Sequence, residues 1–272
     1  MNRMDSIKAS SRNLRDLVVD TVPASLTGST IDADDLIHPV SGQLKGFNLY
    51  LYGGAGAGQA RVIIDFLPAN NRVVTRGFGS IPSTNSSIVI FEKFRKDEYD
   101  NALDRIIGIA RGKYLENRVA TLSIVATQYE YAVPSGFEYI RALRLVPSGY
   151  SDYDADDEVS RIFEFPHTSW RIESNPLGTF IIVFDRRKVS LDSFDEEWVR
   201  VIGQAKPFIG ATDNATIPEA LEEYLIQGTS MMMASQRIDE NREWQAKFYM
   251  FRDMTRDLED YIYRHRMGKK VG

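Results

Sequence analysis

A glycine-rich loop between two β-prone runs is the feature that most constrains the fold of this chain. Residues 48–52 read Asn-Leu-Tyr-Leu-Tyr, residues 53–59 read Gly-Gly-Ala-Gly-Ala-Gly-Gln, and residues 61–66 read Arg-Val-Ile-Ile-Asp-Phe. Such a loop can cradle phosphate, but a P-loop requires Lys and then Ser or Thr after its last glycine, followed by a helix. Here Gln59 and Ala60 follow the last glycine, and a β-branched run favours a strand. The pattern therefore predicts a β-hairpin whose glycines allow positive φ angles and close backbone approach.

The composition is that of a folded protein with a sizeable core. The chain has 272 residues, of which 43% are hydrophobic and 11% aromatic. Its formal charge of −5 and its sequence pI of about 5.4 do not suggest a protein that coats nucleic acid. The absence of cysteine excludes disulfides and thiolate chemistry and fits assembly in a reducing cytoplasm. No apolar run approaches the length of a membrane span and the first residues lack a signal region, so we expect neither membrane insertion nor signal-directed export.

Hydrophobic spacing predicts helices in four places. Apolar residues recur three to four apart over 6–20 and again over 97–115. After residue 216 a first helix opens at Pro218, and a second helix spans about 240–266. Short β-branched and aromatic runs, separated by Gly, Pro, Asn and Ser, predict strands elsewhere. The expected strands are 47–52, 61–66, 72–76, 87–91, 121–126, 129–133, 140–146, 161–165, 170–173, 180–184 and 198–204.

These elements predict an α+β protein in five segments. The expected fold class is a helical core with antiparallel β-barrel or sandwich insertions. The N-terminal helix, the central helix and two long C-terminal helices would make up this core. The segments are an N-terminal helix and irregular arm (1–45), a small β domain with the glycine-rich hairpin (46–94), a core helix (95–118), an antiparallel β domain (119–215), and C-terminal helices with a basic tail (216–272).

Motifs for catalysis or metal binding are not found in the sequence. The three histidines lie far apart and lack the helical pair spacing of a zinc site, and the chain has no Gly-x-Ser-x-Gly elbow. Residues 152–158 copy the alternate aspartates of a calcium loop, but Asp157 stands where that loop needs glycine and Phe163 where it needs glutamate. We therefore predict a solvated acidic loop and no enzyme, catalytic residue, cofactor or metal site. A carboxylate pair assembled by folding is the open alternative.

An apolar stripe near the C-terminus predicts a contact with another helix or subunit. Trp244, Phe248, Phe251 and Leu258 follow a near-heptad spacing, which requires a second apolar surface. The basic residues after this stripe form either a solvated helix end or a partner contact. The candidate interaction residues are Trp244, Phe248, Phe251, Leu258, Arg264, Arg266, Lys269 and Lys270.

Two stretches of the chain resemble a recurring element of tailed-bacteriophage virion proteins. Residues 49–63 give an aromatic strand, a Gly-Ala-Gly-Gln turn, and then a basic residue and an aliphatic strand. Residues 81–88, Ile-Pro-Ser-Thr-Asn-Ser-Ser-Ile, give a proline-containing loop that leads into another strand. The chain is similar to head-to-tail adaptor, or neck connector, proteins. Four further features carry this similarity: the helix that follows, the segment 129–137, the strand end at 202–204 and the Ile-Pro start of the C-terminal helices.

The resemblance implies a structural virion protein in an oligomeric ring, commonly dodecameric, below the portal. In that family the helices form the ring body, a terminal segment docks on the portal, and β-rich parts face tail components. The implied partners are the portal protein and the tail, stopper or terminator proteins, with DNA passing through the channel without sequence-specific binding. The implied location is the virion neck, after assembly in the host cytoplasm.

Two further expectations concern the partner of the basic tail and an alternative role for the whole chain. Within this resemblance, we expect the residues after Arg264 to dock on an acidic portal surface. The alternative is another virion protein, such as a baseplate or fibre component, whose β-rich regions bind the host surface.

Overall fold

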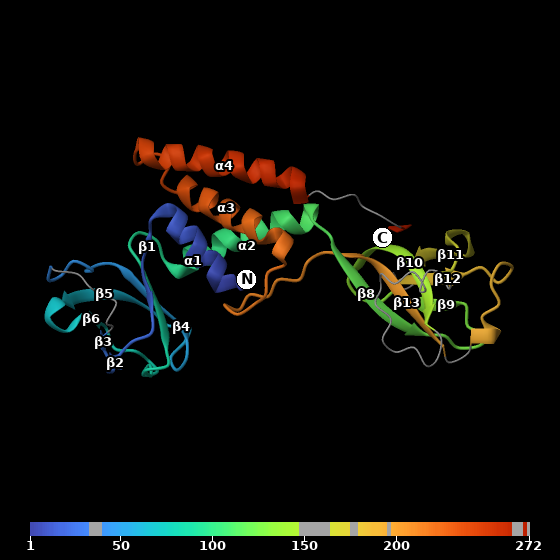
Figure 1. The fold of residues 1–272 in the computed structure, drawn as a ribbon, viewed down its shortest axis with the longest axis horizontal. Helices are drawn as coiled ribbons and strands as arrows, with labels where there is room; N and C mark the ends of the chain where they lie inside the picture. Colours follow the sequence, from blue (N-terminus) through green and yellow to red (C-terminus); the bar gives the residue numbers. More distant parts are fainter. Residues whose placement is uncertain (33–39, 147–163, 175–178, 195–196, 263–268, 271–272) are drawn as a thin grey trace. The chain divides into compact units, whose positions relative to one another are not determined.

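The computed structural model covers residues 1–272 and describes 1–32, 40–146, 164–174, 179–194, 197–262 and 269–270 (Figure 1). The chain divides into two compact units. Unit 1 comprises Met1–Ala110 and Ile209–Ile262, and unit 2 comprises Arg111–Phe208 and Tyr263–Gly272. The chain leaves unit 1 after Ala110 and returns to it at Ile209. The C-terminal helices therefore belong to the same unit as the N-terminal residues.

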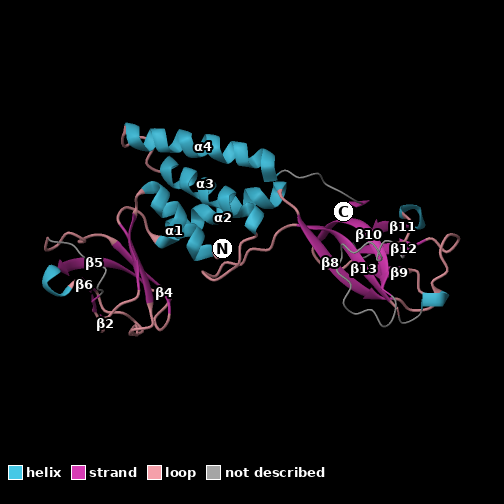
Figure 2. Cartoon of the chain, viewed as in Figure 1, coloured by secondary structure: helices cyan, strands magenta, loops and turns pink. Residues whose placement is uncertain are grey.

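The described residues contain four α-helices, which gather in unit 1 (Figure 2). Asn2 caps the first helix, because its side chain accepts from the Asp5 backbone N–H while the Asp5 side chain accepts from the Asn2 N–H. Arg15 ends this helix in the left-handed conformation, at φ 57°. The helix expected over 97–115 is confirmed, whereas the helix expected over 6–20 is confirmed only as far as Leu14, because Leu17–Thr21 is a strand. The helices are α1 Arg3–Leu14, α2 Lys96–Lys113, α3 Glu219–Ser235 and α4 Arg242–Ile262.

The strands of unit 1 form one antiparallel sheet in the order β1-β7-β4-β5-β6-β3-β2. Val19 of β1 and Ile31 of β3 come from opposite parts of this order, yet both belong to one buried cluster. The sheet therefore curls into a half-barrel around its own apolar core. Its strands are β1 Leu17–Thr21, β2 Ser25–Leu26, β3 Thr30–Asp32, β4 Asn48–Gly53, β5 Ala60–Leu67, β6 Arg72–Thr75 and β7 Ser87–Phe91.

Aromatic side chains attach the helices to the outer face of this sheet. The ring of Phe91, at the end of β7, lies 5.2 Å from that of Tyr99 on α2. Phe94, just before α2, lies 5.7 Å from Trp244 of α4 in an edge-on arrangement. Within the helical layer, a Cβ at Gly228 of α3 would lie 2.8 Å from Ile106 of α2, so glycine permits the close approach of these helices.

The strands of unit 2 form two antiparallel sheets that share one apolar core. Leu143 and Val201 of the first sheet and Ile182 of the second lie in the same cluster and are fully buried. This arrangement is a β-sandwich. The first sheet has the order β14-β10-β13-β8 and the second β11-β12-β9, with strands β8 Glu116–Ser123, β9 Glu130–Ala132, β10 Phe137–Val146, β11 Trp170–Ser174, β12 Phe180–Phe184, β13 Trp198–Ala205 and β14 Lys269–Lys270.

The expected fold class, a helical core with β insertions, is wrong. The described chain is sheet-rich, with antiparallel sheets that enclose cores of their own, and it is α+β only in the broad sense. The helices of unit 1 pack on a sheet and do not form a separate body that carries it. Residues 17–32, expected as a helix end and an irregular arm, supply three strands of this sheet. The expected strand at 161–165 lies largely outside the described residues.

Candidate functional site

The glycine-rich loop joins β4 to β5 as a tight hairpin. Gly54, Gly56 and Gly58 have φ angles of 72°, 78° and 90°, in the region that favours glycine. The Gly58 N–H donates to the Leu51 carbonyl at 2.8 Å and so closes the turn. Because a strand and not a helix follows, the hairpin prediction is confirmed.

The side chain of Gln59 connects this hairpin to the loop between β6 and β7. Its Nε2 donates to the carbonyl of Gly56 at 3.0 Å and to that of Ser80 at 2.8 Å. Its Oε1 accepts from the Gly79 N–H at 2.8 Å. One amide thus uses both its donor and its acceptor groups to join two loops. We call residues 53–59 and 77–86 together the latched loops.

A second set of contacts joins the same loops at Ser86. The buried Ser86 hydroxyl donates to the Ala55 carbonyl at 2.7 Å and accepts from the Ser83 N–H at 3.0 Å. Beside it, a Cβ at Gly54 would lie only 2.5 Å from the Asn85 carbonyl oxygen. The two backbones therefore touch, and a side chain at position 54 would push them apart. This contact explains why glycine and serine occur at these positions.

The latched loops expose an apolar tip. The Ile81 side chain is 64% exposed, while the adjacent Pro82 is buried. Exposed single apolar residues are common on protein surfaces. What distinguishes Ile81 is that the backbone on which it sits is fixed at Gln59 and Ser86 before any partner arrives.

Several polar groups of the latched loops bind one another and not an outside ligand. The Ala57 N–H donates to the Gly54 carbonyl at 3.3 Å. The only nearby cation that the hairpin sequence offers, Arg61, donates to the Gly77 carbonyl at 3.1 Å and lies over the Phe78 ring. An anion cradle needs free N–H groups and a cation directed at the ligand. The geometry therefore suits a docking element better than a phosphate site.

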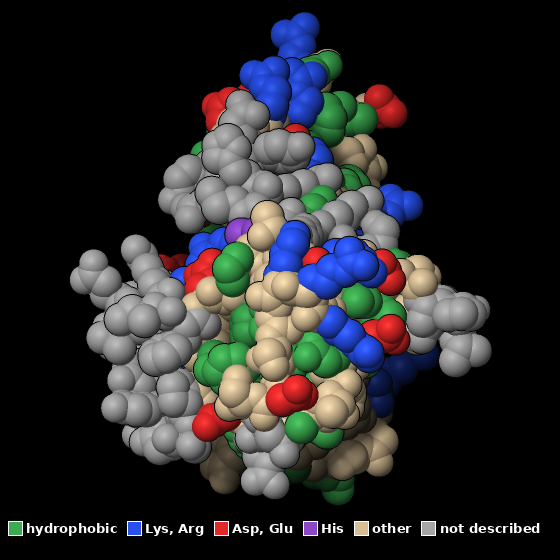
Figure 3. Space-filling model, turned by 90° about the vertical axis from the view of Figure 1, so that its right-hand side faces the viewer, with side chains coloured by type: hydrophobic (Ala, Val, Ile, Leu, Met, Phe, Trp, Pro, Cys, Tyr) green, Lys and Arg blue, Asp and Glu red, His purple; other side chains and the backbone are tan. Residues whose placement is uncertain are grey.

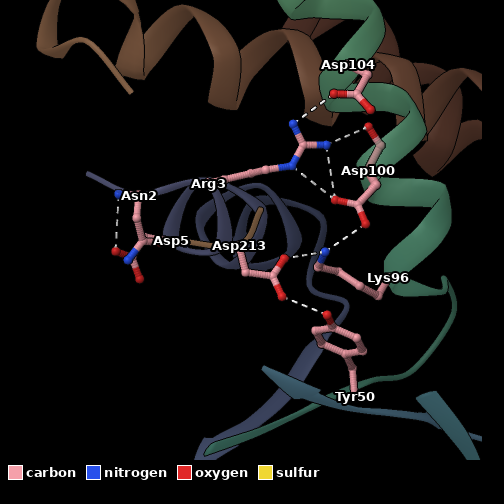
Figure 4. A network of polar contacts seen from close by, with 8 residues as sticks. All are labelled: Asn2, Arg3, Asp5, Tyr50, Lys96, Asp100, Asp104 and Asp213. Atoms are coloured by element: carbon pink, nitrogen blue, oxygen red, sulfur yellow. Dashed lines mark hydrogen bonds and ion pairs between the residues drawn. The ribbon is translucent and has the colours of Figure 1, made fainter. Parts of the chain in front are cut away.

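A buried charge network holds the N-terminus against α2 in unit 1 (Figure 4). The Arg3 side chain is only 2% exposed, and its guanidinium contacts Asp104 at 2.8 Å and Asp100 at 3.2 Å. Lys96 lies between Asp100 and Asp213, at 2.7 Å from each carboxylate. Each buried cation therefore has two carboxylate partners, as burial of a charge requires.

This network also reaches the sheet and the segment before α3. The Tyr50 hydroxyl of β4 donates to Asp213 at 2.7 Å, and burial, with this hydrogen bond, raises the pKa of Tyr50. The backbone N–H of Arg3 donates to the Ala215 carbonyl at 2.9 Å, and the terminal amino group of Met1 pairs with Glu222. These contacts fix the relative positions of α1, α2 and β4. Their role is structural, since each charge is occupied by a partner within the chain.

The part of the chain that the structure describes bears on the sequence-based expectations for histidines, acidic residues and membrane helices. Within it, no group of three His, Asp or Glu side chains could hold a metal ion. His167 packs on Trp170, whereas His38, His265 and the acidic run 152–158 lie outside the described residues. Among the described helices, none is both long and apolar enough to cross a membrane.

The structure places the predicted C-terminal interaction residues in different settings. Trp244 and Phe251 are buried, and Phe248 and Leu258 are half-buried, so the stripe packs within unit 1. Lys269 and Lys270 form β14 and pair with Ile140 and Tyr139 of β10. Arg264 and Arg266 lie outside the described residues.

The sequence did not predict the hydrogen bonds by which Gln59 and Ser86 join the latched loops. The Gly-Gln step at 58–59 and the Pro-Ser-Thr-Asn-Ser run at 82–86 are visible in the sequence, but nothing in either pattern indicates that the two segments bind each other. Comparison with known proteins adds no relative: no protein-family model matches the chain, and the search of curated proteins finds no match.

Proposed function

We propose that this chain is a structural virion protein of a tailed phage, a head-to-tail adaptor in a ring that joins capsid to tail and continues the DNA channel. The observation that carries the proposal is the pair of latched loops. Gln59 and Ser86 lie in the two stretches that resemble a recurring element of phage virion proteins, 49–63 and 81–88, and their side chains join the loops of these stretches into one element. This element presents Ile81 to a partner.

The latch supports docking because it lowers the entropy cost of binding. Ordering a free loop on association costs roughly 1–2 kcal/mol per residue, and an already ordered loop avoids that cost. Gln59 and Arg61 supply this order through four hydrogen bonds to backbone groups of Gly56, Gly77, Gly79 and Ser80. In the proposed ring, Ile81 is buried against a neighbouring subunit or the portal.

The charge of the chain is compatible with a channel that DNA traverses. The formal charge is −5. The face of unit 2 in Figure 3 shows Lys and Arg side chains interspersed with Asp and Glu, and not gathered in one basic field. Tight DNA binding depends on neutralising many phosphates with clustered cations. A surface of mixed charge supports passage of DNA over retention.

Complementation in the phage tests the proposal through Ile81. Ile81→Asp places a charge on the tip without touching the latch, and Thr84→Asp is the matched control, because Thr84 is exposed on the same loop. We expect both variants to fold with the same melting temperature. Only Ile81→Asp should leave DNA-filled heads without attached tails.

Normal infectious particles with Ile81→Asp would refute the docking role of the tip. Complete particles that fail to adsorb to cells would instead identify the chain as a baseplate or fibre component, and would refute the adaptor proposal.

A further inference from the structure

Among the described residues, strand β8 of unit 2 is an edge strand, and its outer edge is open along its whole length. It pairs with β13 in a continuous register from Glu116↔Ala205 to Ser123↔Trp198, with no bulge, and it is the last strand in the order of its sheet (Figure 1). No other strand among the described residues pairs with it. An unpaired strand of this length is a template for another strand.

The residues that direct their backbone groups toward the open edge can be identified. The Ile124 N–H donates to the Glu197 carbonyl at 2.8 Å, so position 124 faces β13. In an antiparallel ladder the direction alternates with each residue. Asn117, Val119, Thr121 and Ser123 therefore point their N–H and C=O groups away from β13. The side chains of these four residues are also exposed.

This edge lacks the devices that usually prevent strand addition. Such edges are normally short, bulged, charged or interrupted by proline. The segment 119–123 reads Val-Ala-Thr-Leu-Ser and contains neither a charge nor a proline. Glu116 and Arg118 are the charged residues of β8, and both lie at its start.

Two exposed apolar side chains lie near this edge, one on β8 itself and one on the neighbouring strand β13. Val119 is 47% exposed and Trp198 is 56% exposed. Trp198 lies directly across from Ser123 in the ladder. The serine side chain is small, which leaves the indole ring able to lean across it toward the open edge.

We propose that a second copy of this chain pairs its β8 antiparallel with this β8, with Thr121 opposite Thr121 of the second copy. The two four-stranded sheets then form one continuous sheet across a two-fold axis. Thr121 is at the centre of the uncharged segment, and its backbone groups point to the open edge, so the two threonines exchange both backbone hydrogen bonds. Paired threonines are a favourable cross-strand combination.

The side chains that this register brings together support a second copy as the occupant. Val119 faces Ser123 of the second copy, with Trp198 of that copy next in the same row, and the two-fold axis repeats this apolar contact. Arg118 faces Ile124, so no like charges oppose each other. An unrelated extended segment would not be expected to match both the uncharged centre and the flanking tryptophan.

This contact goes beyond the proposed function and does not depend on it. It joins the same patch on both copies, whereas a ring requires two different, complementary patches. It also lies in unit 2, while the latched loops lie in unit 1. A chain that failed as an adaptor could still form this dimer, and the reverse also holds.

A single engineered cysteine tests the register, because the natural chain has none. Hydrogen-bonded residues opposite each other have Cα atoms roughly 5.5 Å apart, within the range that a disulfide spans. We expect Thr121→Cys to give a covalent dimer under mild oxidation of the folded full-length chain. Asn117→Cys is the matched control: it lies on the same face of the same strand but several residues from the axis, and it should remain monomeric in a denaturing gel. Equal cross-linking of the two variants, or none at Thr121→Cys, would overturn the proposal.

A proline variant tests the hydrogen bonds of the same contact. Thr121→Pro removes an N–H that points to the open edge and leaves the ladder with β13 unchanged. Sedimentation velocity should show loss of the dimer for Thr121→Pro and its retention for Thr121→Val, with circular dichroism confirming that both variants fold. An unchanged dimer in Thr121→Pro, or a wild-type chain that stays monomeric at every concentration, would contradict the inference.

Discussion

Units 1 and 2 are both built on antiparallel sheets that enclose apolar cores, but unit 1 adds a buried network of ion pairs between its elements. In unit 1 ionisable groups connect the sheet to the helices, since Arg3, Lys96 and Tyr50 all bind aspartates across element boundaries. In unit 2 two sheets enclose fully buried aliphatic side chains such as Ile182 and Val201. We therefore expect the stability of unit 1 to change more with pH than that of unit 2, although both units also enclose apolar cores.

Tyrosines of the two units differ in the groups that accept their hydroxyl hydrogen bonds. In unit 1 Tyr50, Tyr52 and Tyr99 each donate to an aspartate, at 2.7 to 2.8 Å. Burial is the largest cause of the raised pKa of each, and the neighbouring carboxylate adds to it. In unit 2 the Tyr131 hydroxyl donates to the Gln128 carbonyl at 3.0 Å, so its partner is a neutral group.

Truncation of the aromatic centre of unit 2 should have the largest effect. Phe184 is buried and its ring lies 5.2 Å from that of Phe165. Phe184→Ala should lower the free energy of unfolding of unit 2 by about 3–5 kcal/mol, because it removes transfer energy and leaves a cavity. Calorimetry with fragment-resolved hydrogen exchange should show loss of protection in unit 2 alone. Equal losses in both units would show that they unfold as one.

Removal of the buried guanidinium of unit 1 should follow in size. Arg3→Met keeps an apolar side chain in place but leaves Asp104 and Asp100 without this partner, although Lys96 still contacts Asp100. Breaking a fully buried pair costs about 3–5 kcal/mol, and partial exposure of these carboxylates reduces our expectation to about 2 kcal/mol. Arg12→Met is the control, since the Arg12 pair with Asp20 is exposed. Chemical denaturation that finds the two variants equal would argue against the network as the anchor of unit 1.

Alkaline pH should separate the two units without any mutation. The folded-state pKa of Tyr50 lies above the unfolded value of 10.0. The stabilisation linked to this raised pKa is therefore fully present below pH 10 and is lost as the pH rises toward the folded pKa. Unit 1 should lose protection in that range before unit 2. Tyr50→Phe should reduce the pH dependence of unit 1, with Tyr52 and Tyr99 supplying the remainder, whereas Tyr131→Phe should not alter it. The same slope in wild type and Tyr50→Phe would refute the linkage.

Loss of the Gln59 side-chain hydrogen bonds in the latched loops should have the smallest effect on stability. Gln59→Ala should cost about 1 kcal/mol, because its hydrogen bonds are partly exposed and water replaces them. The amide of Gly79 should nevertheless exchange much faster, since it donates to Gln59. Gln59→Glu keeps this acceptor but loses the donor to Ser80, so its exchange rates should be intermediate. Unchanged exchange at Gly79 in Gln59→Ala would show that the loops are fixed by other contacts.

Local sequence patterns predicted individual turns and helices well, but they did not predict which layer of the fold each segment joins. The β-branched residues after Gly58 identified the hairpin, because turn chemistry and strand preference are properties of adjacent residues. The helical spacing of Leu14, Leu17 and Val18 masked β1, since the helix ends at Arg15 and the last two belong to a strand. Periodicity also cannot tell which layer encloses the core, and for this reason the helical-core prediction failed.

The contacts that define the candidate site join residues far apart in the chain. Gln59 binds groups about twenty positions later, and Arg3 binds aspartates roughly a hundred positions away. No period or motif reports such pairs. The apolar stripe on α4 was predicted in part. Its spacing identified the buried face of the helix, but only the structure shows that Trp244 packs on Phe94 of the same chain.

An electron cryo-microscopy map of the neck of the proposed virion tests the central claim most directly. We expect the chain to form a ring in the neck, with Ile81 of the latched loops buried against a neighbouring subunit or the portal and with Gln59 still bound to Ser80. A map that places the chain in the baseplate or a fibre, or in a neck ring with Ile81 facing solvent, would contradict it.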